Sequence, residues 1–333
     1  MRIIFFGTAS YDKQSFDKEL VDYPDIQIDY TETNLTPVTA VLARGYDAVC
    51  AFVNADISPM TLEILAGLDV KLVLMRCAGF DAVNVPKAEE LGIKVTRVPA
   101  YSPEAIAEHA MALGLAANRR IHKGYNRVRE NDFALDGLVG CTLHGKTAGI
   151  IGTGRIGAAL CRICKGFGMT VLGSDLYPNQ KLVEDGIVDE YVDYDELYAR
   201  ADFISLHAFL NEESRHMIND ESIAKMKDGV IFVNTGRGGL VDTQALIRGI
   251  LSGKIGAAGL DVYDEENANV YKNRAGEVID TVTARLCSFP NVVMTSHQAF
   301  FTYEALSEIA RVTLDNAKAY ADGTDFVDRS VVC

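Results

Sequence analysis

The sequence lacks a long hydrophobic run, a signal-peptide core and any fixed repeat. No window of about 18 uncharged apolar residues occurs in the 333-residue chain, so we expect no membrane-spanning helix. The first apolar run, at residues 3–6, is too short for a signal peptide, which makes the cytoplasm the expected location. The 28 glycines and 8 prolines follow no period, which excludes a collagen-like chain. A hydrophobic content of 48% instead predicts a globular protein.

Positive charge is also scarce. The chain has 32 Lys and Arg against 46 Asp and Glu, a formal net charge of −14. A field of this sign repels phosphate backbones and anionic lipids, so we expect neither nucleic acid nor a membrane as a partner. Seven cysteines are scattered along the chain, and the C-x-x-C pair Cys161 and Cys164 has no second pair to complete a zinc site. We therefore expect no metal and a reducing compartment.

Short apolar runs alternate with longer segments of helical periodicity, which is typical of an α/β protein with parallel sheets. Long helices are expected after Ser102, where Pro103 and Glu104 form a helix start, and after Thr302. Buried strands are expected at residues 3–6, 48–53, 71–74, 148–151, 170–172, 203–206, 230–233 and 292–295.

The length of the chain exceeds the size at which one core usually stops growing, so we expect two domains. Two segments interrupt the regular pattern: the one between Pro99 and Pro103, and residues 298–302. If both are hinges, residues 101–298 form one domain. Residues 1–100 and 299–333 together form the other, with a cleft between the two domains.

A glycine-rich motif lies at residues 149–157, G-I-I-G-T-G-R-I-G, between an apolar strand and a helical pattern. Gly152 permits a tight turn, Gly154 lets the backbone approach a pyrophosphate, and Gly157 lets helix and strand pack closely. The next strand ends at Asp175, whose carboxylate suits the ribose hydroxyls of adenosine. A 2′-phosphate would meet this carboxylate and no arginine follows it, so the motif predicts NAD rather than NADP.

Other strand ends carry groups suited to hydride transfer at a carbonyl. Such chemistry needs an acid, a cation to hold the substrate and a carboxylate beside the acid. Arg237 lies in a glycine-rich loop after the strand at 230–233, and His297 follows the strand at 292–295. The acidic run at 261–266 could supply the carboxylate or be a solvated loop. His207 suits a place beside the cofactor, and no partner is evident for the histidines at 109, 122, 144 and 216.

Several sequence blocks occur together in one order. They are R-C-A-G-F-D at 76–81, V-P-A-Y-S-P-E-A at 98–105, A-E-H-A at 107–110, the glycine-rich motif, V-N-T-G-R-G at 233–238, L-D-V-Y at 260–263 and H-Q-A-F-F-T at 297–302. Over nearly its whole length the chain resembles the D-isomer-specific 2-hydroxyacid dehydrogenases, and among them the fermentative NAD-dependent D-lactate dehydrogenases. The resemblance implies two Rossmann-like or flavodoxin-like domains, with residues 101–298 binding NAD and the ends of the chain binding substrate.

The resemblance also implies residue roles. Arg237 would bind the substrate carboxylate and His297 would be the acid/base. Glu266, five residues after Asp261, would stabilise the imidazolium of His297. The expected substrate-binding residues are Phe52, Ala78, Gly79, Tyr101 and Phe300. The expected cofactor-binding residues are Gly152, Gly154, Arg155, Ile156, Gly157, Asp175, His207, Ala208, Phe209, Thr235, Gly236, Arg237 and Asp261.

The reaction implied is the reversible reduction of pyruvate to D-lactate by NADH. Two alternatives stay open: a dehydrogenase for a larger 2-keto acid, such as 2-ketoisocaproate, phenylpyruvate or 2-ketoglutarate, and a non-catalytic NAD(H)-sensing regulator. Phe209 and Ser214 replace the Pro and Asn of many relatives beside the cofactor. A homo-oligomer through the NAD-binding domain is expected, with the helix after Ser102 at the contact.

Overall fold

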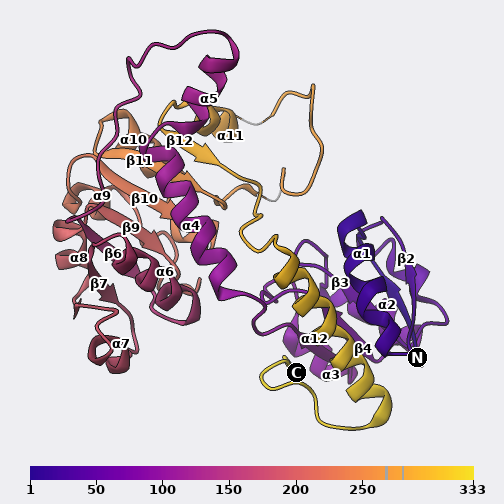
Figure 1. Cartoon of the computed structure of the whole chain (residues 1–333). Coiled ribbons are helices and arrows are strands. Elements are labelled where there is room, and N and C mark those ends of the chain that lie inside the picture. Colours follow the sequence, from indigo (N-terminus) through magenta and orange to yellow (C-terminus); the bar gives the residue numbers. More distant parts are fainter. Residues whose placement is uncertain (267–268, 280) are drawn as a thin grey trace. The chain divides into compact units, whose positions relative to one another are not determined.

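The computed structural model describes residues 1–266, 269–279 and 281–333 (Figure 1). The chain divides into two compact units, one formed by Met1–Ser102 with Phe301–Cys333 and the other by Pro103–Phe300. The chain thus leaves the first unit after Ser102 and returns to it at Phe301. The sequence analysis placed these crossings after residues 100 and 298.

The first unit is built on a five-stranded parallel sheet in the order β2-β1-β3-β4-β5. Every residue of β3 and β4 is buried, as expected for central strands that are covered on both faces. The strands of this unit are β1 (Arg2–Phe5), β2 (Gln27–Tyr30), β3 (Ala48–Ala51), β4 (Leu72–Met75) and β5 (Lys94–Arg97). Its helices are α1 (Ser10–Glu19), η1 (Leu20–Asp22), η2 (Ala40–Ala43), α2 (Pro59–Gly67), α3 (Val85–Leu91) and α12 (Tyr303–Asp322).

The C-terminal segment completes this unit. The hydroxyl of Thr302 caps α12 by accepting a hydrogen bond from the backbone N–H of Ala305, and the helix packs against α1 and β4. The last residues then run along the edge strand β5, where the N–H of Val332 donates to the carbonyl of Val95. The end of the chain therefore belongs to the same sheet as its beginning.

The second unit contains a seven-stranded parallel sheet in the order β12-β11-β10-β9-β6-β7-β8. The order reverses between β6 and β9, and ligands of such sheets bind at the carboxyl ends of the strands at this point. The strands are β6 (Thr147–Ile151), β7 (Thr170–Ser174), β8 (Glu190–Tyr191), β9 (Phe203–Leu206), β10 (Val230–Asn234), β11 (Ile255–Leu260) and β12 (Val292–Met294). The helices are α4 (Pro103–Asn118), α5 (Ile121–Arg129), α6 (Arg155–Gly166), α7 (Gln180–Glu184), α8 (Tyr194–Arg200), α9 (Asp220–Lys225), η3 (Gly238–Leu240), α10 (Thr243–Leu251) and α11 (Thr281–Ser288).

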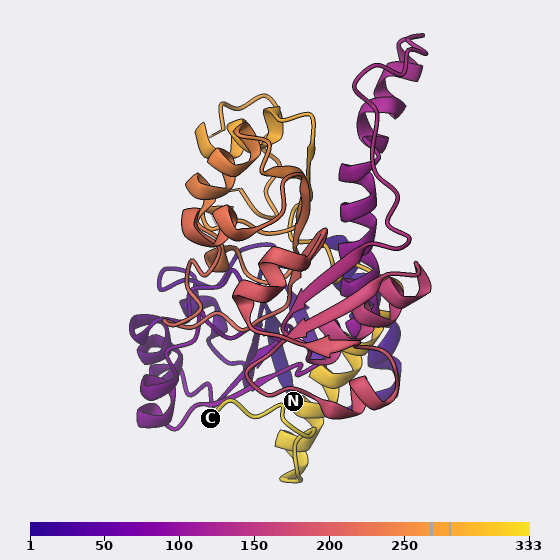
Figure 2. The same cartoon turned by 90° about the vertical axis from the view of Figure 1, so that its left-hand side faces the viewer.

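Helices cover both faces of this second sheet, and each face has its own apolar core. The long helix α4 lies against β11 and α6 (Figure 1). Beyond it, α5 and residues 130–142 extend away from the sheet, at the upper right of Figure 2. The α/β class with two parallel sheets is thus confirmed. None of the helices in the described residues combines the length and apolar character needed to cross a membrane.

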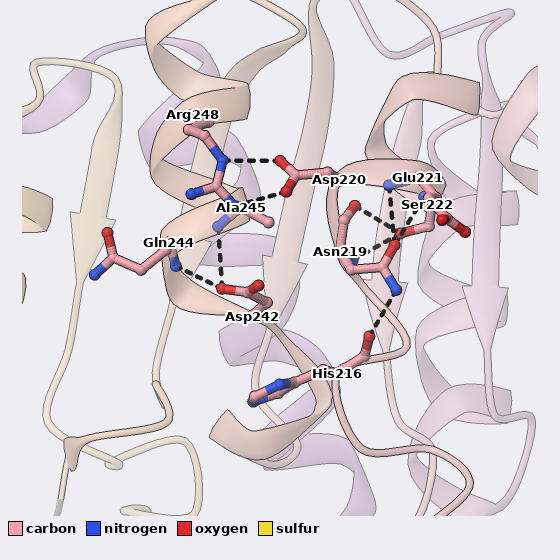
Figure 3. A network of polar contacts seen from close by, with 9 residues as sticks. All are labelled: His216, Asn219, Asp220, Glu221, Ser222, Asp242, Gln244, Ala245 and Arg248. Carbon is pink, nitrogen blue, oxygen red and sulfur yellow. Dashed lines mark hydrogen bonds and ion pairs between the residues drawn. The ribbon is translucent and has the colours of Figure 1, made fainter.

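Figure 3 shows the contacts that fix the starts of α9 and α10. The side chains of Asn219 and Asp242 each accept two backbone N–H hydrogen bonds, as N-cap residues do. Arg248 on α10 forms a bidentate ion pair with Asp220 on α9, at 2.9 and 2.6 Å. The Asn219 amide also donates to the carbonyl of His216. These contacts hold in place the loop that carries His216.

Candidate active site

Three predicted functional side chains lie just past the carboxyl ends of three neighbouring strands. Arg237 follows β10, Glu266 follows β11 and His297 follows β12. The three strands are adjacent and parallel, so their carboxyl ends meet at one edge of the sheet. The fold therefore brings together residues that the sequence separates.

His297 and Glu266 form a close pair. Nδ1 of His297 lies 2.9 Å from Oε1 of Glu266, and the two side chains are 21% and 16% exposed. The carboxylate can only accept, so it fixes the proton of a neutral imidazole on Nδ1 and stabilises an imidazolium by charge. Nε2 of His297 makes no hydrogen bond to any residue that the structure describes. This nitrogen is thus available to exchange a proton with a ligand.

The backbone of His297 adopts the left-handed conformation, with φ of +50°. Such a conformation is unfavourable for a residue with a side chain and persists where the surroundings hold it. The N–H of His297 donates to the carbonyl of Asp261 at 2.8 Å, and its carbonyl accepts from the Tyr271 hydroxyl at 3.0 Å. The two peptide groups on either side of His297 are therefore held in place, and the backbone conformation sets the direction of the imidazole ring.

Asp261 is the anchor of this segment and is only 1% exposed. Burial would raise the pKa of its carboxyl group, but hydrogen bonds from His109, Thr295 and the N–H groups of Gln298 and Ala299 outweigh it and hold the pKa below its usual range. Its carboxylate thus holds the turn around His297. Its predicted contact with the cofactor stays a prediction.

The sequence analysis found no partner for His109 or His216, and for both residues this expectation was wrong. Nε2 of His109, on α4, lies 3.1 Å from the Thr295 hydroxyl and 3.5 Å from Asp261. Nε2 of His216 lies 2.8 Å from Asp264. The only sequence signal for His109 was its place in the A-E-H-A block.

The three neighbouring carboxylates of the acidic run have different partners. Asp264 pairs with His216, and Glu265 accepts a hydrogen bond from the Thr243 hydroxyl at 3.2 Å. Glu266 alone of the three pairs with His297. The structure therefore distinguishes these acids by their contacts, as the spacing alone did not.

Arg237 lies in a tightly held loop. The side chain of Asn234 accepts from the N–H of Gly236 and donates to the carbonyl of Arg237, both at 3.0 Å. A Cβ at Gly238 would lie 2.2 Å from the backbone carbonyl of Tyr263, so the loop approaches the segment after β11 too closely for any side chain there. The backbone of this loop is thereby fixed next to the segment after β11, and the Arg237 side chain is half-buried.

The glycine-rich turn has the geometry that its motif requires. Gly152 has φ of +87°, and a Cβ there would lie 2.6 Å from the backbone of His207. A Cβ at Gly157 would lie 1.9 Å from the carbonyl oxygen of Gly152, so the helix and the turn touch directly. At Gly154, by contrast, a Cβ would meet nothing within 4 Å. The open side of the turn is thus the side on which a pyrophosphate would lie.

A cavity of about 450 Å³ lies at this turn, and its lining includes Gly154, Arg155 and Arg162. Arg155 and Ile156 form the first turn of α6, where unpaired N–H groups and the helix dipole favour an anion. Asp175 directly follows β7, at the neighbouring strand end. Open space, arginine side chains, a helix N-terminus and an acidic residue at the next strand end together fit NAD, and the predicted contact of Asp175 with the ribose stays a prediction.

The other predicted cofactor residues lie at the ends of β9 and β10. The hydroxyl of Thr235, next to Gly236, is buried and has no hydrogen-bond partner in the described part of the chain, which suits a polar ligand. Burial lowers the pKa of His207 to about 4, so this histidine is neutral at neutral pH. Ala208 follows it and is partly buried, whereas Phe209 is 84% exposed.

The predicted substrate residues divide between the two units. Phe52, Ala78 and Gly79 lie past the carboxyl ends of β3 and β4 in the first unit, and the N–H groups of Ala78 and Gly79 make no hydrogen bond within the described residues. Tyr101 is half-buried in the segment that leaves this unit. Phe300 is buried at the end of the second unit.

A buried arginine positions Phe52. The Arg76 guanidinium is 2% exposed, pairs with Asp12 at 3.3 Å and lies over the rings of Phe5 and Phe52, at 4.4 and 4.8 Å. The carbonyl of Ala78 accepts a hydrogen bond from an arginine on β5 at 2.9 Å. The loop after β4 is therefore held on both sides. Sequence reasoning had given Arg76 no role.

Comparison with known proteins places these features in one family. The model of the D-isomer specific 2-hydroxyacid dehydrogenase NAD binding domain matches residues 111–299. The 2-hydroxyacid dehydrogenase homolog 1 of Schizosaccharomyces pombe is 47% identical over 334 residues, which cover 100% of this chain and 99% of that protein. The D-lactate dehydrogenase of Escherichia coli is 45% identical over 317 residues, 95% of each chain. The solved structure of the pyruvate reductase of Chlamydomonas reinhardtii is similar with a TM-score of 0.92, at 40% identity over 98% of both chains.

Proposed function

Since the chain belongs to the D-isomer-specific 2-hydroxyacid dehydrogenases and is an NAD-dependent oxidoreductase, we propose that it catalyses the reversible reduction of pyruvate to D-lactate. The observation that carries the proposal is the half-buried pair of His297 and Glu266, in which Nε2 of the histidine makes no hydrogen bond to any group that the structure describes. A relative that is a D-lactate dehydrogenase, at 45% identity, supports the choice of substrate.

NADH, when bound, supplies the hydride that reduces the keto carbon. His297 donates the proton from Nε2 to the carbonyl oxygen as this becomes a hydroxyl, and in the reverse direction it accepts that proton. Glu266, 2.9 Å from Nδ1, stabilises the imidazolium that donates the proton. Arg237 presents a planar pair of N–H groups that match the two oxygens of the substrate carboxylate. The family resemblance gives the N–H groups of Ala78 and Gly79 a role in binding the substrate carboxylate as well.

Pyruvate is favoured over larger 2-keto acids by the residues expected around its side chain. Phe52, Tyr101 and Phe300 are aromatic, and the ring of Phe52 is held against the buried Arg76. Aromatic side chains suit a small apolar group such as a methyl group. A dicarboxylate such as 2-ketoglutarate would need a further cation, and Arg76 is already engaged by Asp12. We expect activity to fall as the side chain of the keto acid grows.

The proposal is tested by following NADH oxidation over a panel of 2-keto acids, with chiral analysis of the product. Rapid turnover of pyruvate to D-lactate alone would support it. Preference for a bulkier acid would replace the substrate and keep the residue roles. Bound NADH without turnover on any acid would favour a sensing regulator. In the same assay, His297→Ala should lose turnover by orders of magnitude while NADH still binds, and near-normal turnover would remove His297 from this role.

We infer that the protein works as a homo-oligomer joined through the NAD-binding unit. The support is apolar surface on the projecting segment after α4, where Tyr125, Phe133, Leu135 and Val139 are 60%, 72%, 80% and 86% exposed (Figure 2). Sedimentation should give more than one chain per particle, and Phe133→Ser with Leu135→Ser should dissociate it. A monomeric wild-type protein would contradict this inference.

We also place the protein in the cytoplasm and in fermentative metabolism. The support is the odd number of cysteines, seven, scattered along the chain, which is typical of proteins from a reducing compartment. Reduction of pyruvate reoxidises NADH, which is the redox step that fermentation needs.

A further inference from the structure

A chain of hydroxyl groups ends on Asp175, the acid expected at the adenosine ribose. Oδ2 of Asp175 accepts hydrogen bonds from the N–H of Thr153 at 2.6 Å and from its hydroxyl at 3.1 Å. Oδ1 accepts from the N–H of Tyr177 at 2.9 Å. The Thr153 hydroxyl also lies 2.9 Å from the hydroxyl of Tyr191, which lies 3.2 Å from the N–H of Asn179. Four residues from three segments, Thr153, Tyr191 and the loop of Asp175 and Asn179, are thus linked in series.

The direction of this chain follows from what each group can do. The backbone N–H of Asn179 can only donate, so the Tyr191 oxygen accepts there. The Thr153 hydrogen is directed to Asp175, which can only accept when ionised, so the Thr153 oxygen accepts from Tyr191. The Tyr191 hydrogen thus points to Thr153 at 2.9 Å, the shorter of its two contacts, since the carbonyl of Asn179 lies at 3.5 Å. Every hydrogen points toward the carboxylate. The series therefore supplies Asp175 with a polarised donor and fixes its rotation.

The packing around the chain is tight. Thr153 is 4% exposed and lies in the glycine-rich turn itself. Tyr191 lies on the edge strand β8, and its ring covers β7 where that strand has Gly173. A Cβ at Gly173 would lie 2.8 Å from the ring of Tyr191 and 3.2 Å from the methyl carbon of Thr153. The absence of a side chain at this position therefore lets the two hydroxyls meet.

We propose that Thr153 and Tyr191 are positioning residues that set the cofactor specificity of the protein through Asp175. Held by two bonds to Thr153 and one from the N–H of Tyr177, the carboxylate keeps one lone pair, on Oδ1, that can accept from a ribose hydroxyl of NADH. A carboxylate that cannot rotate away also repels a 2′-phosphate most strongly, because its charge stays at the site. Asp175 alone supplies the charge, and the two hydroxyls supply its fixed position. This proposal rests on the assignment of the NAD site to the glycine-rich turn.

The test uses direct binding of NADH and NADPH without substrate. The chain has no tryptophan, so the fluorescence of the bound nicotinamide can be followed without interference from that residue. Thr153→Val and Tyr191→Phe each remove one hydroxyl at nearly constant shape. Tyr198→Phe is the matched control, since Tyr198 is a buried tyrosine of the same unit that no hydrogen bond connects to Asp175 among the described residues. Melting temperatures of all variants report whether the fold is kept.

We expect Thr153→Val and Tyr191→Phe to weaken NADH binding by about three- to tenfold, within the range for the loss of one ordinary hydrogen bond. NADPH binding should change by less than about twofold or improve, so the ratio of the two dissociation constants falls. Because the hydroxyls act in series, the double variant should lose little more than Thr153→Val alone. Tyr198→Phe should leave the ratio unchanged.

An unchanged ratio in both variants, or additive losses in the double variant, would overturn the proposal. Asp175→Ala separates the possible failures. If it weakens NADH binding while the two hydroxyl variants do not, Asp175 acts without the chain and the proposal is wrong. If Asp175→Ala changes neither constant, the ribose site lies elsewhere and the proposal falls with it. Turnover of pyruvate is measured separately, so the proposed reaction can stand in either case.

Discussion

Glu266→Gln is the sharpest test of the proposed mechanism. Glutamine keeps the length of the side chain and an oxygen that accepts the Nδ1 hydrogen of His297, and it removes only the negative charge. The hydrogen bond of 2.9 Å can therefore persist while the electrostatic support of the imidazolium disappears. The variant separates charge from position.

The size of the effect follows from the geometry of the pair. Two unit charges about 4 Å apart attract by about 4 kcal/mol at an effective dielectric constant near 20. The side chains are 21% and 16% exposed, so solvent screens part of this attraction, and we take about 2 kcal/mol as the loss. At about 1.4 kcal/mol per factor of ten, kcat/KM for pyruvate should fall about 30-fold. The imidazolium is the proton donor, so the loss belongs to the chemical step.

Glu265→Gln is the matched control, because it makes the same change one residue away. Its carboxylate contacts the Thr243 hydroxyl and no imidazole that the structure describes, so kcat/KM should stay within about threefold of the wild-type value. Both variants should bind NADH with unchanged affinity by fluorescence titration. Full activity of Glu266→Gln, or equal losses in the two variants, would refute the assignment of Glu266 to the histidine.

Three further outcomes follow from the structure. Gly157→Ala would place a Cβ 1.9 Å from the carbonyl of Gly152, so we expect loss of NADH binding and a lower melting temperature, and wild-type binding would contradict the close packing of turn and helix. The pKa of His207 is about 4 in the folded protein and 6.5 in the unfolded chain. Between these pH values the unfolded chain binds a proton at this histidine and the folded protein does not. Stability should therefore fall by at most about 3 kcal/mol between pH 6.5 and 4 in urea unfolding, and His207→Gln should flatten this slope. His109→Phe removes a hydrogen bond to Asp261, so we expect kcat to fall about tenfold while the affinity for NADH is kept. His109→Gln should restore most of the lost kcat. Equal kcat values in both variants would speak against a positioning role.

The fold class could be read from the sequence because buried parallel strands are continuous apolar runs. The eight expected runs all correspond to strands of the two sheets, with ends shifted by at most two residues. The strands β2, β5, β8 and β11 were not among these runs. β11 is almost fully buried, but its sequence I-G-A-A-G-L consists mostly of small residues and forms a weak apolar run. β2 and β8 are edge strands in which no residue is fully buried, and β5, next to the last residues of the chain, has charged residues at both ends. Half-covered strands do not need an apolar run, so they leave little signal.

The sequence predicted the main residues of the candidate site, but it did not predict the residues that hold them in position. Arg237 and His297 stand at strand ends, and the glycine-rich motif has a local pattern that reflects local backbone geometry. His109, Arg76 and Tyr191 have no such pattern. Each acts through a contact with a residue far away in the chain, such as the pair of Arg76 and Asp12, 64 positions apart.

Local rules thus sufficed for the α/β class, the cofactor type and the candidates at the strand ends, because strand periodicity, tight turns and helix starts depend on neighbouring residues. The pairing of those candidates did not follow from local rules. Three acids stand side by side at 264–266, and only the packing of β11 beside β12 brings Glu266 to a histidine 31 residues later while directing its neighbours to His216 and Thr243. Consecutive side chains point in different directions, so each contacts a different part of the fold. The partner of a charged group is therefore determined by the tertiary structure.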